Sequence, residues 1–279
     1  MSDERFARIE ALFGTDCLAR LNAASVAVFG LGGVGGSCVE ALARGGIGRL
    51  VLVDGDAIEP SNINRQALAR ESTVGMRKVD AACTFVQDLN PHCRVETHDM
   101  FLQADEVAPL LNRIVACDSK SGSGSGMPPA PPSPSDTAAR HAPLDFIIDC
   151  VDSLDVKVAL ACWARDAGIP IVSCMGTARK IDPSRFEFTD LFNTQVCPLC
   201  RSMRRKARAA GIEALTVLYS QEEPLASVQE STPMSSESVE NADRVSRVLG
   251  TASYVPPIAG MMLAGYAIRM MCGTGIKRT

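Results

Sequence analysis

The chain has 279 residues, of which 46% are hydrophobic and 22% charged, so it is long enough to bury a substantial core. Its formal net charge of −4 argues against general affinity for nucleic acids, although a local basic patch can override that balance. The first residues, MSDERFARIE, are too charged for a secretory signal peptide. The eleven cysteines are scattered at mostly irregular spacing, which favours reduced thiols in a cytoplasmic protein over a disulfide framework.

The first half of the chain alternates apolar, β-branched runs with stretches of helical apolar spacing. We expect strands over 25–30, 49–54 and 94–97, and helices over 35–44 and 78–89. The second half continues with a helix over about 104–112, strands over 144–152 and 169–175, and a helix between them over about 155–167. This alternation implies right-handed crossovers and predicts an α/β fold, a doubly wound and mostly parallel sheet, in a single domain over 1–279.

Three stretches depart from this alternation. The run 120–135 is rich in Gly, Ser and Pro and cannot bury a core, so we read it as a disordered surface insertion. The stretch 220–241 is acidic and rich in serine, which predicts a mobile loop. The apolar run 258–268 is too short for a membrane span, which needs about 20 apolar residues, and we expect a buried helix whose glycines allow close packing.

The sequence FGLGGVGG follows the first predicted strand and opens the first predicted helix. This arrangement brings backbone N–H groups and the positive end of a helix to a phosphate. Asp54 ends the next strand about 20 residues later, where it can hydrogen-bond a ribose hydroxyl. Taken alone, the pattern favours an NAD- or FAD-dependent oxidoreductase.

The residues after Asp54 favour ATP instead. The stretch DGDAIEPSNINRQ places carboxylates, amides and a cation beyond the end of a parallel strand, where such folds bind ligands. Lys78 adds a second cation and Asp152 a further carboxylate. Two cations suit a triphosphate, and a carboxylate suits Mg²⁺, whereas hydride transfer needs neither. The sequence contains no GxxxxGK[ST], so this is not a P-loop.

In order and spacing, FGLGGVGG, LVDGDAIEPSNINRQ, VGMRK and DCVDS resemble the adenylating domain shared by ubiquitin-activating enzymes and the bacterial MoeB/ThiF enzymes. Downstream, GTARKIDPSRFEFTDLFNTQVCPLC, VLYSQEEP and TASYVPPIAGMMLAGYAI resemble the tRNA threonylcarbamoyladenosine dehydratase branch of that family. The resemblance covers most of the chain outside 120–135 and 220–241. It implies a Rossmann-like adenylating fold, a homodimer, ATP with Mg²⁺, and a tRNA nucleoside as substrate.

The resemblance also assigns roles to individual residues. Asp54 would bind the ribose and Asp152 would hold Mg²⁺, while Arg8 would reach the partner subunit's site. Arg8, Arg65, Lys78 and Asp152 would form the catalytic set. The nucleotide would rest on the glycine turn and the polar residues after it: Gly30, Gly32, Gly33, Gly35, Asp54, Asp56, Asn62, Arg65, Gln66 and Lys78.

Cys197 and Cys200 form a CxxC, and relatives that activate sulfur-carrier proteins hold structural zinc with two such pairs. No second pair exists here, so the sequence does not predict zinc. A redox pair is an alternative, but the thioredoxin-like surroundings are missing and we expect an ordinary reduced pair.

The stretch RSMRRKAR carries five cations and no acid in an acidic protein. Such a run is either a solvated helix face or a surface that follows RNA phosphates. On the RNA interpretation the contacts would come from Arg201, Arg204, Arg205, Lys206 and Arg208.

Four functions therefore stay open at this point. The favoured one is ATP-dependent cyclisation of threonylcarbamoyladenosine in tRNA through a carboxyl adenylate. The alternatives are adenylation of the C-terminal glycine of a sulfur-carrier or ubiquitin-like protein, an NAD-dependent oxidoreductase, and a nucleotide-binding scaffold without catalysis. The need for a sulfur-relay protein partner or a monovalent cation also stays open.

Overall fold

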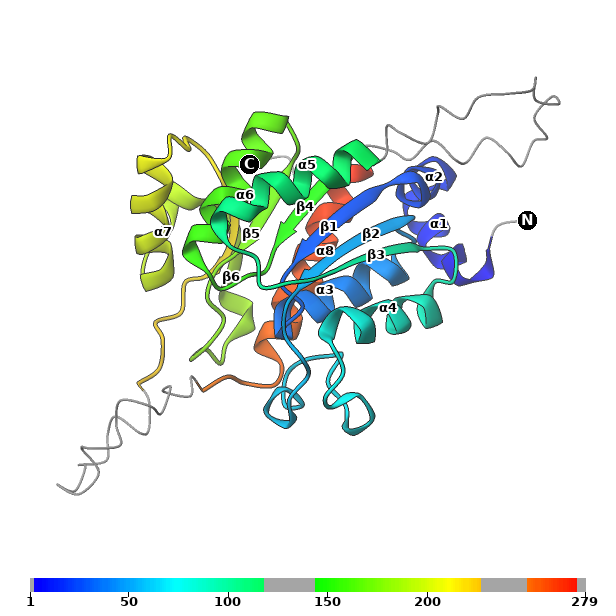
Figure 1. The fold of residues 1–279 in the computed structure, drawn as a ribbon, viewed down its shortest axis with the longest axis horizontal. Helices are drawn as coiled ribbons and strands as arrows, with labels where there is room; N and C mark the ends of the chain where they lie inside the picture. The colour runs from blue at the N-terminus through cyan, green and yellow to red at the C-terminus, as the bar shows by residue number, and fades with distance from the viewer. Residues whose placement is uncertain (1–2, 118–143, 227–249, 275–279) are drawn as a thin grey trace.

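A seven-stranded sheet with helices on both faces forms the framework of the computed structural model, which describes residues 3–117, 144–226 and 250–274 (Figure 1). The strand order is β3-β2-β1-β4-β5-β7-β6. All neighbours are parallel except β6, which runs antiparallel to β7. The strands are β1 (Ser25–Phe29), β2 (Arg49–Asp54), β3 (Arg94–Asp99), β4 (Phe146–Asp149), β5 (Ile171–Cys174), β6 (Phe186–Asp190) and β7 (Thr216–Ser220). The predicted α/β class and the mostly parallel sheet are confirmed.

The helices divide between the two faces because successive side chains of a strand point to opposite sides of the sheet. Val26 and Val28 of β1 pack in the core beneath α2 (Thr15–Ala23), α3 (Gly33–Arg44), α4 (Lys78–Leu89) and α8 (Val255–Met271). Ala27 and Phe29 pack on the other side, against α5 (Val107–Cys117) and α6 (Leu154–Ala167). A third cluster lies between α6 and α7 (Pro198–Ala209), while the short α1 (Ala7–Phe13) precedes α2. Both faces of β1, β2 and β4 are thus buried, as their apolar runs predicted.

Helix α8 lies directly against α3, on the face that carries the glycine turn. A Cβ on Gly260 would overlap the carbonyl oxygen of Val34, so only glycine permits this close approach. The predicted buried helix over 258–268 is therefore confirmed, with both ends extending further. None of the helices in the described ranges has the length and apolarity that crossing a bilayer needs.

Strands β6 and β7 were not predicted, and the predicted strand over 144–152 is shorter, because the chain turns after Asp149. The insertion predicted over 120–135 lies outside the described residues, as does the stretch 220–241 from residue 227 onward. The start of that second stretch is described. Ser220 ends β7, and the buried Glu222 carboxylate accepts hydrogen bonds from the backbone N–H groups of Ile181 and Asp182.

The expectation that the cysteines are all reduced is wrong at one pair. A disulfide joins Cys17 of α2 to Cys272, which directly follows α8. The two residues are separated by 255 positions, and only the packing of α2 against the end of α8 brings them together. The other cysteines whose side chains are described are free.

Candidate functional site

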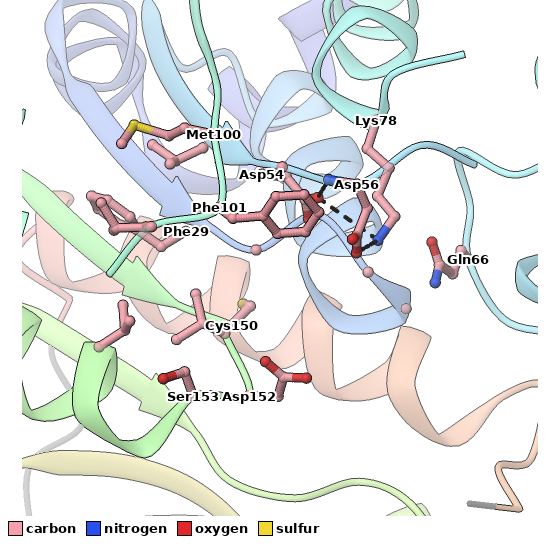
Figure 2. Close-up of a pocket in the computed structure, with 18 of the residues that line it drawn as sticks. Phe29, Asp54, Asp56, Gln66, Lys78, Met100, Phe101, Cys150, Asp152 and Ser153 are labelled. Atoms are coloured by element: carbon pink, nitrogen blue, oxygen red, sulfur yellow. Dashed lines mark hydrogen bonds and ion pairs between the residues drawn. The ribbon is translucent and has the colours of Figure 1, made fainter. Parts of the chain in front are cut away.

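A cavity of about 780 Å³ opens at the carboxyl ends of β1, β2 and β4 (Figure 2). This is the edge of a doubly wound sheet at which ligands bind. Most of the predicted site residues line it: Gly30, Gly32, Gly33, Asp54, Asp56, Asn62, Arg65, Gln66, Lys78 and Asp152. The structure therefore brings together side chains from segments more than a hundred residues apart.

The glycine turn supplies the floor of the cavity. Gly30 has φ 85°, a left-handed conformation, and its N–H donates to the carbonyl of Val53 at 2.8 Å. A Cβ on Gly35 would overlap the carbonyl oxygen of Gly30, so Gly35 allows α3 to start directly beneath the turn. Gly35 does not itself line the cavity, and its predicted place in the turn under a nucleotide stays a prediction.

Helix α3 begins at this floor without a side-chain cap. Its N-cap residue Gly32 and its first residue Gly33 both line the cavity. The first-turn N–H groups of a helix have no intrahelical partner, and the helix dipole places positive potential at the same end. The floor is therefore suited to bind an anion such as a phosphate.

One wall carries a cluster of two carboxylates and a lysine. The Lys78 ammonium lies 2.6 Å from a carboxylate oxygen of Asp56 and 3.8 Å from one of Asp54. Lys78 and Asp54 have side chains only 6% and 8% exposed, whereas that of Asp56 is 51% exposed. Asp54 is fixed further by accepting the N–H groups of Leu31 at 2.6 Å and Asp56 at 2.8 Å. Because Asp56 is solvated, a bound phosphate can replace it beside Lys78 at little cost.

The segment after Asp56 adds a cation and two amides. The Arg65 guanidinium donates to the carbonyl of Ser61 at 3.0 Å and to the side-chain oxygen of Asn64 at 2.8 Å. It forms no ion pair with a carboxylate in the described ranges, so its charge is uncompensated. The Asn62 side chain instead holds the local turn, accepting the N–H of Glu59 at 3.2 Å.

Gln66 is buried, and its side-chain oxygen has no hydrogen-bond partner among the described residues. An unpaired buried amide costs free energy, so a native site normally supplies a partner. Gln66 thus has hydrogen-bonding capacity left for a ligand in the cavity, and Figure 2 shows it next to Lys78.

Asp152 lies across the cavity from Lys78, in the turn that follows β4 (Figure 2). A fully buried ion pair supports this turn: the Lys157 ammonium lies 3.1 Å from both carboxylate oxygens of Asp149. Asp149 in turn accepts the N–H of Val151 at 3.1 Å. Asp152 itself is exposed.

A single carboxylate fits Mg²⁺ that arrives with phosphates, because this ion keeps several waters and takes one or two protein carboxylates. In the part of the chain that the structure describes, no group of three His, Cys, Asp or Glu side chains could hold a metal by itself. The site therefore suits a shared metal and not an all-protein cage.

The sequence analysis missed the loop after β3, whose Met100, Phe101, Leu102 and Gln103 line the cavity. Phe101 is 66% exposed, an unusual place for an aromatic ring unless it stacks on a ligand. The place of this loop after a predicted strand could have indicated it, because β3 lies parallel to β2 and its carboxyl end reaches the same edge of the sheet.

Two other predictions fall outside the cavity. Arg8 lies on α1, is exposed, and does not line the cavity of its own chain. On α7, Arg204 donates to the Thr194 carbonyl at 2.8 Å, Lys206 pairs with Asp155, and Arg208 lies 5.2 Å from the centre of the Phe192 ring. Of the predicted RNA contacts, only Arg201 and Arg205 are exposed and form no side-chain hydrogen bond, ion pair or ring contact with another described residue.

The sequence profile of the ThiF family matches residues 6–279. The chain belongs to the ThiF family. This ThiF-family chain is 32% identical over 268 residues to the tRNA threonylcarbamoyladenosine dehydratase of Bacillus subtilis (strain 168), covering 95% of this chain and 93% of the relative.

The fold also matches crystal structures of the E. coli tRNA N6-threonylcarbamoyladenosine dehydratase at 26% identity. The complex with AMP gives a TM-score of 0.75 and covers 97% of this chain and 95% of that one. The complex with ATP gives a TM-score of 0.74, and the match covers 99% of this chain and 97% of that one. The ThiF-type adenylating fold predicted from the motifs is thus confirmed.

Proposed function

We propose that this ThiF-family protein uses ATP to cyclise threonylcarbamoyladenosine in tRNA. The threonine carboxylate attacks the α-phosphate of ATP and pyrophosphate leaves, which gives a carboxyl adenylate. The ureido group then attacks the activated carboxyl and AMP leaves, so the nucleoside has lost one water. The observation that carries the proposal is the cavity itself. A glycine floor, two cations and several carboxylates, the exposed Asp152 among them, converge on a single space, in a chain that aligns over 95% of its length with a dehydratase of this name.

The residues of this chain would bind and orient the nucleotide. The start of α3 and the side chains of Arg65 and Lys78 would carry the phosphates, where negative charge builds up as pyrophosphate leaves. Asp54 would bind the ribose, because its carboxylate is held rigidly at the end of β2. The unpaired side-chain oxygen of Gln66 would accept a hydrogen bond from a ribose hydroxyl. No side-chain nucleophile is needed, since both attacking groups belong to the substrates.

Asp152 would hold Mg²⁺, which supplies charge neutralisation at the phosphates when bound. The support is the exposure of this carboxylate at the cavity and the rigid turn beneath it. Replacement of Asp152 by Asn should raise the Mg²⁺ concentration needed for half-maximal turnover. An unchanged requirement would remove Asp152 from the metal.

The tRNA would approach along α7, whose start lies at the same edge of the sheet as the cavity. Leu199 packs against Gly176 just after β5, and Lys206 pairs with Asp155 at the start of α6, three residues beyond Asp152. Arg201 and Arg205 remain for phosphate contacts. Arg204, Lys206 and Arg208 would instead hold α7 in place, so fewer cations would contact the RNA than the sequence predicted.

Isotopic exchange of pyrophosphate into ATP separates this function from its alternatives. An adenylating enzyme catalyses exchange only with its carboxylate substrate present, and we expect exchange with modified tRNA. Exchange driven by a sulfur-carrier protein, and not by tRNA, would favour the carrier-activating alternative. No exchange with either would leave a redox enzyme or a scaffold.

We also propose a homodimer in which Arg8 of one chain serves the partner subunit's site. The support is that Arg8 is exposed, makes no hydrogen bond or ion pair with any described residue, and lies away from its own cavity. The chains Arg8→Ala and Asp152→Ala should each be inactive alone. Mixed at equal amounts after dissociation, they should regain about one quarter of wild-type activity, because half the dimers are mixed and each has one intact site. No recovery would show that Arg8 acts within its own chain or not at all.

A further inference from the structure

A pair of cysteines lies at the start of α7, outside the nucleotide cavity. Cys197 is the N-cap residue of α7 and Cys200 lies in its first turn. Cys197 is 5% exposed, while Cys200 is completely buried. Neither residue lines the cavity, and the proposed function uses neither.

The surroundings of Cys197 favour its thiolate. The hydrogen bond from the Cys200 thiol lowers the pKa of Cys197 from the usual 9.0 to about 6, helped by the N–H groups of Cys200 and Leu199 and by the charge of Lys180, and opposed by burial. A cysteine at a helix N-terminus in a CxxC is the arrangement that produces reactive thiolates. The thiolate of Cys197 is therefore favoured, unlike that of Cys38 or Cys174, whose pKa burial raises.

Lys180 is a buried cation beside this pair. It is only 3% exposed, and its ammonium donates to the backbone carbonyl of Glu222 and forms no ion pair with a carboxylate in the described ranges. Burial lowers the pKa of Lys180, and the negative charges of a Cys197 thiolate and of Glu222 favour its ammonium form. The positive charge of Lys180 acts on Cys197 in return.

The backbone next to Cys197 is also unusual. Val196 has φ 61° although it is β-branched, and its side chain is 45% exposed. A β-branched residue in the left-handed region is strained, and such strain gathers at functional sites. The exposed Val196 also places solvent directly beside the more accessible of the two cysteines.

A zinc site does not fit this pair. Structural zinc takes four ligands, and no third His, Cys, Asp or Glu joins Cys197 and Cys200 in the described part of the chain. Two free thiols in the first turn of α7, of which Cys197 is the more exposed and Cys200 is fully buried, fit thiol–disulfide chemistry.

We propose that Cys197 and Cys200 are a redox-active dithiol that exchanges with low-molecular-weight disulfides of the glutathione type. The Cys197 thiolate attacks one sulfur of the disulfide, the S–S bond breaks, and one thiolate leaves. Cys200 then loses its proton to solvent and attacks the Cys197 sulfur, which closes the intramolecular disulfide and expels the second thiolate. Two electrons pass from the cysteine pair to the small disulfide, which is reduced to two thiols.

The second step becomes possible only after the first. The hydrogen bond to Cys197 is the largest cause that raises the pKa of the Cys200 thiol. Once Cys197 is part of a mixed disulfide, it no longer carries the negative charge that holds this proton. Thr194 and Arg204 then favour the Cys200 thiolate. The pair is thus ordered, with Cys197 attacking and Cys200 resolving.

The test treats the reduced full-length protein with oxidised glutathione and maps its cysteines by mass spectrometry. In the wild type we expect the Cys197–Cys200 peptide lighter by two hydrogens. Cys200→Ser should instead accumulate one glutathione on Cys197, while Cys197→Ser should leave Cys200 unmodified. Cys83→Ser, which changes a cysteine on α4, is the matched control and should form the Cys197–Cys200 disulfide like the wild type.

Alkylation of the wild type with iodoacetamide at varied pH gives a readout that needs no variant. Modification of Cys197 should be half-maximal near pH 6, whereas that of Cys83, whose pKa burial raises, should still increase above pH 9. The other groups facing the pair are Lys180, Cys174, Tyr219 and Arg204; burial raises the pKa of Cys174 and of Tyr219 to about 12 and lowers that of Lys180. A Cys197 profile that follows Cys83, or no disulfide after glutathione treatment, would overturn the proposal.

Discussion

The buried ion pair beneath Asp152 gives a sharp test of how the site is held in place. Lys157→Met removes the ammonium and leaves the Asp149 carboxylate, with both side chains 0% exposed in the wild type. The carboxylate then keeps only the Ser173 hydroxyl and the Val151 N–H at 3.1 Å. It loses two charge-assisted contacts at 3.1 Å, and Lys157 no longer ties it to the Cys174 carbonyl at 2.7 Å.

The size of the effect follows from these contacts. At 3.1 Å and an effective dielectric constant of about 20, the attraction of the pair is roughly 5 kcal/mol. Breaking a buried pair by removing one partner typically costs about 3–5 kcal/mol, because the remaining charge is uncompensated. We therefore expect Lys157→Met to lower the free energy of unfolding by about 4 kcal/mol, and Tm by roughly 10 °C at this chain length.

The assay is urea unfolding followed by circular dichroism, with two comparison variants. Lys157→Met combined with Asp149→Asn removes both charges but keeps an acceptor for Val151, so it should recover about 2 kcal/mol relative to Lys157→Met. Arg44→Met breaks the exposed pair with Glu40 on α3 and should cost less than about 1 kcal/mol. A loss below about 1 kcal/mol for Lys157→Met, or a double variant no more stable than the single one, would refute this reasoning.

Three further predictions follow from single contacts. Lys78→Ala should lower the rate of ATP–pyrophosphate exchange by about 10²–10³-fold, because it removes a cation from the site of developing charge. The control Arg113→Ala, on the surface of α5, should leave the rate unchanged, and equal rates for the two variants would show that Lys78 does not contact the phosphates. Gly35→Ala should lower Tm sharply, because the new Cβ would overlap the Gly30 carbonyl. At Gly265 a Cβ would meet only the end of the flexible Arg269 side chain, so Gly265→Ala should change the free energy of unfolding by no more than about 1 kcal/mol. Similar Tm values for the two variants would contradict the close packing at Gly35. Arg201→Ala with Arg205→Ala should flatten the slope of log affinity for tRNA against log salt by about 1.8, with the KM for ATP unchanged; an unaltered slope would place the RNA elsewhere.

The sequence predicted what is local. The glycine turn and the strand ending at Asp54 were predictable because an apolar β-branched run, a glycine that needs a positive φ and a following amphipathic helix each leave a mark in neighbouring residues. The cavity was predictable for the same reason, since Asp54, Lys78 and Asp152 follow strands or open helices whose ends meet at one edge of a parallel sheet.

What the sequence could not predict depends on long-range packing. Strand β6 is a half-polar strand, FEFTD, which among the described residues pairs only with β7, about 30 residues later in the chain. The Cys17–Cys272 disulfide needs α2 to pack on the end of α8. A run of basic residues also does not show which of them have partners within the protein. On α7, Arg204 contacts Thr194, Lys206 contacts Asp155 and Arg208 contacts Phe192. The assignments of individual residues to ATP, Mg²⁺ and tRNA stay predictions.

Mass spectrometry of tRNA nucleosides tests the central claim most directly. The purified protein is incubated with ATP, Mg²⁺ and tRNA that carries threonylcarbamoyladenosine, and the nucleosides are analysed under conditions that preserve the cyclic product. The account predicts that the modified nucleoside loses the mass of one water, with one AMP formed for each nucleoside converted and no conversion by Lys78→Ala. An unchanged nucleoside with active wild-type enzyme, together with adenylation of a protein C-terminus, would contradict it.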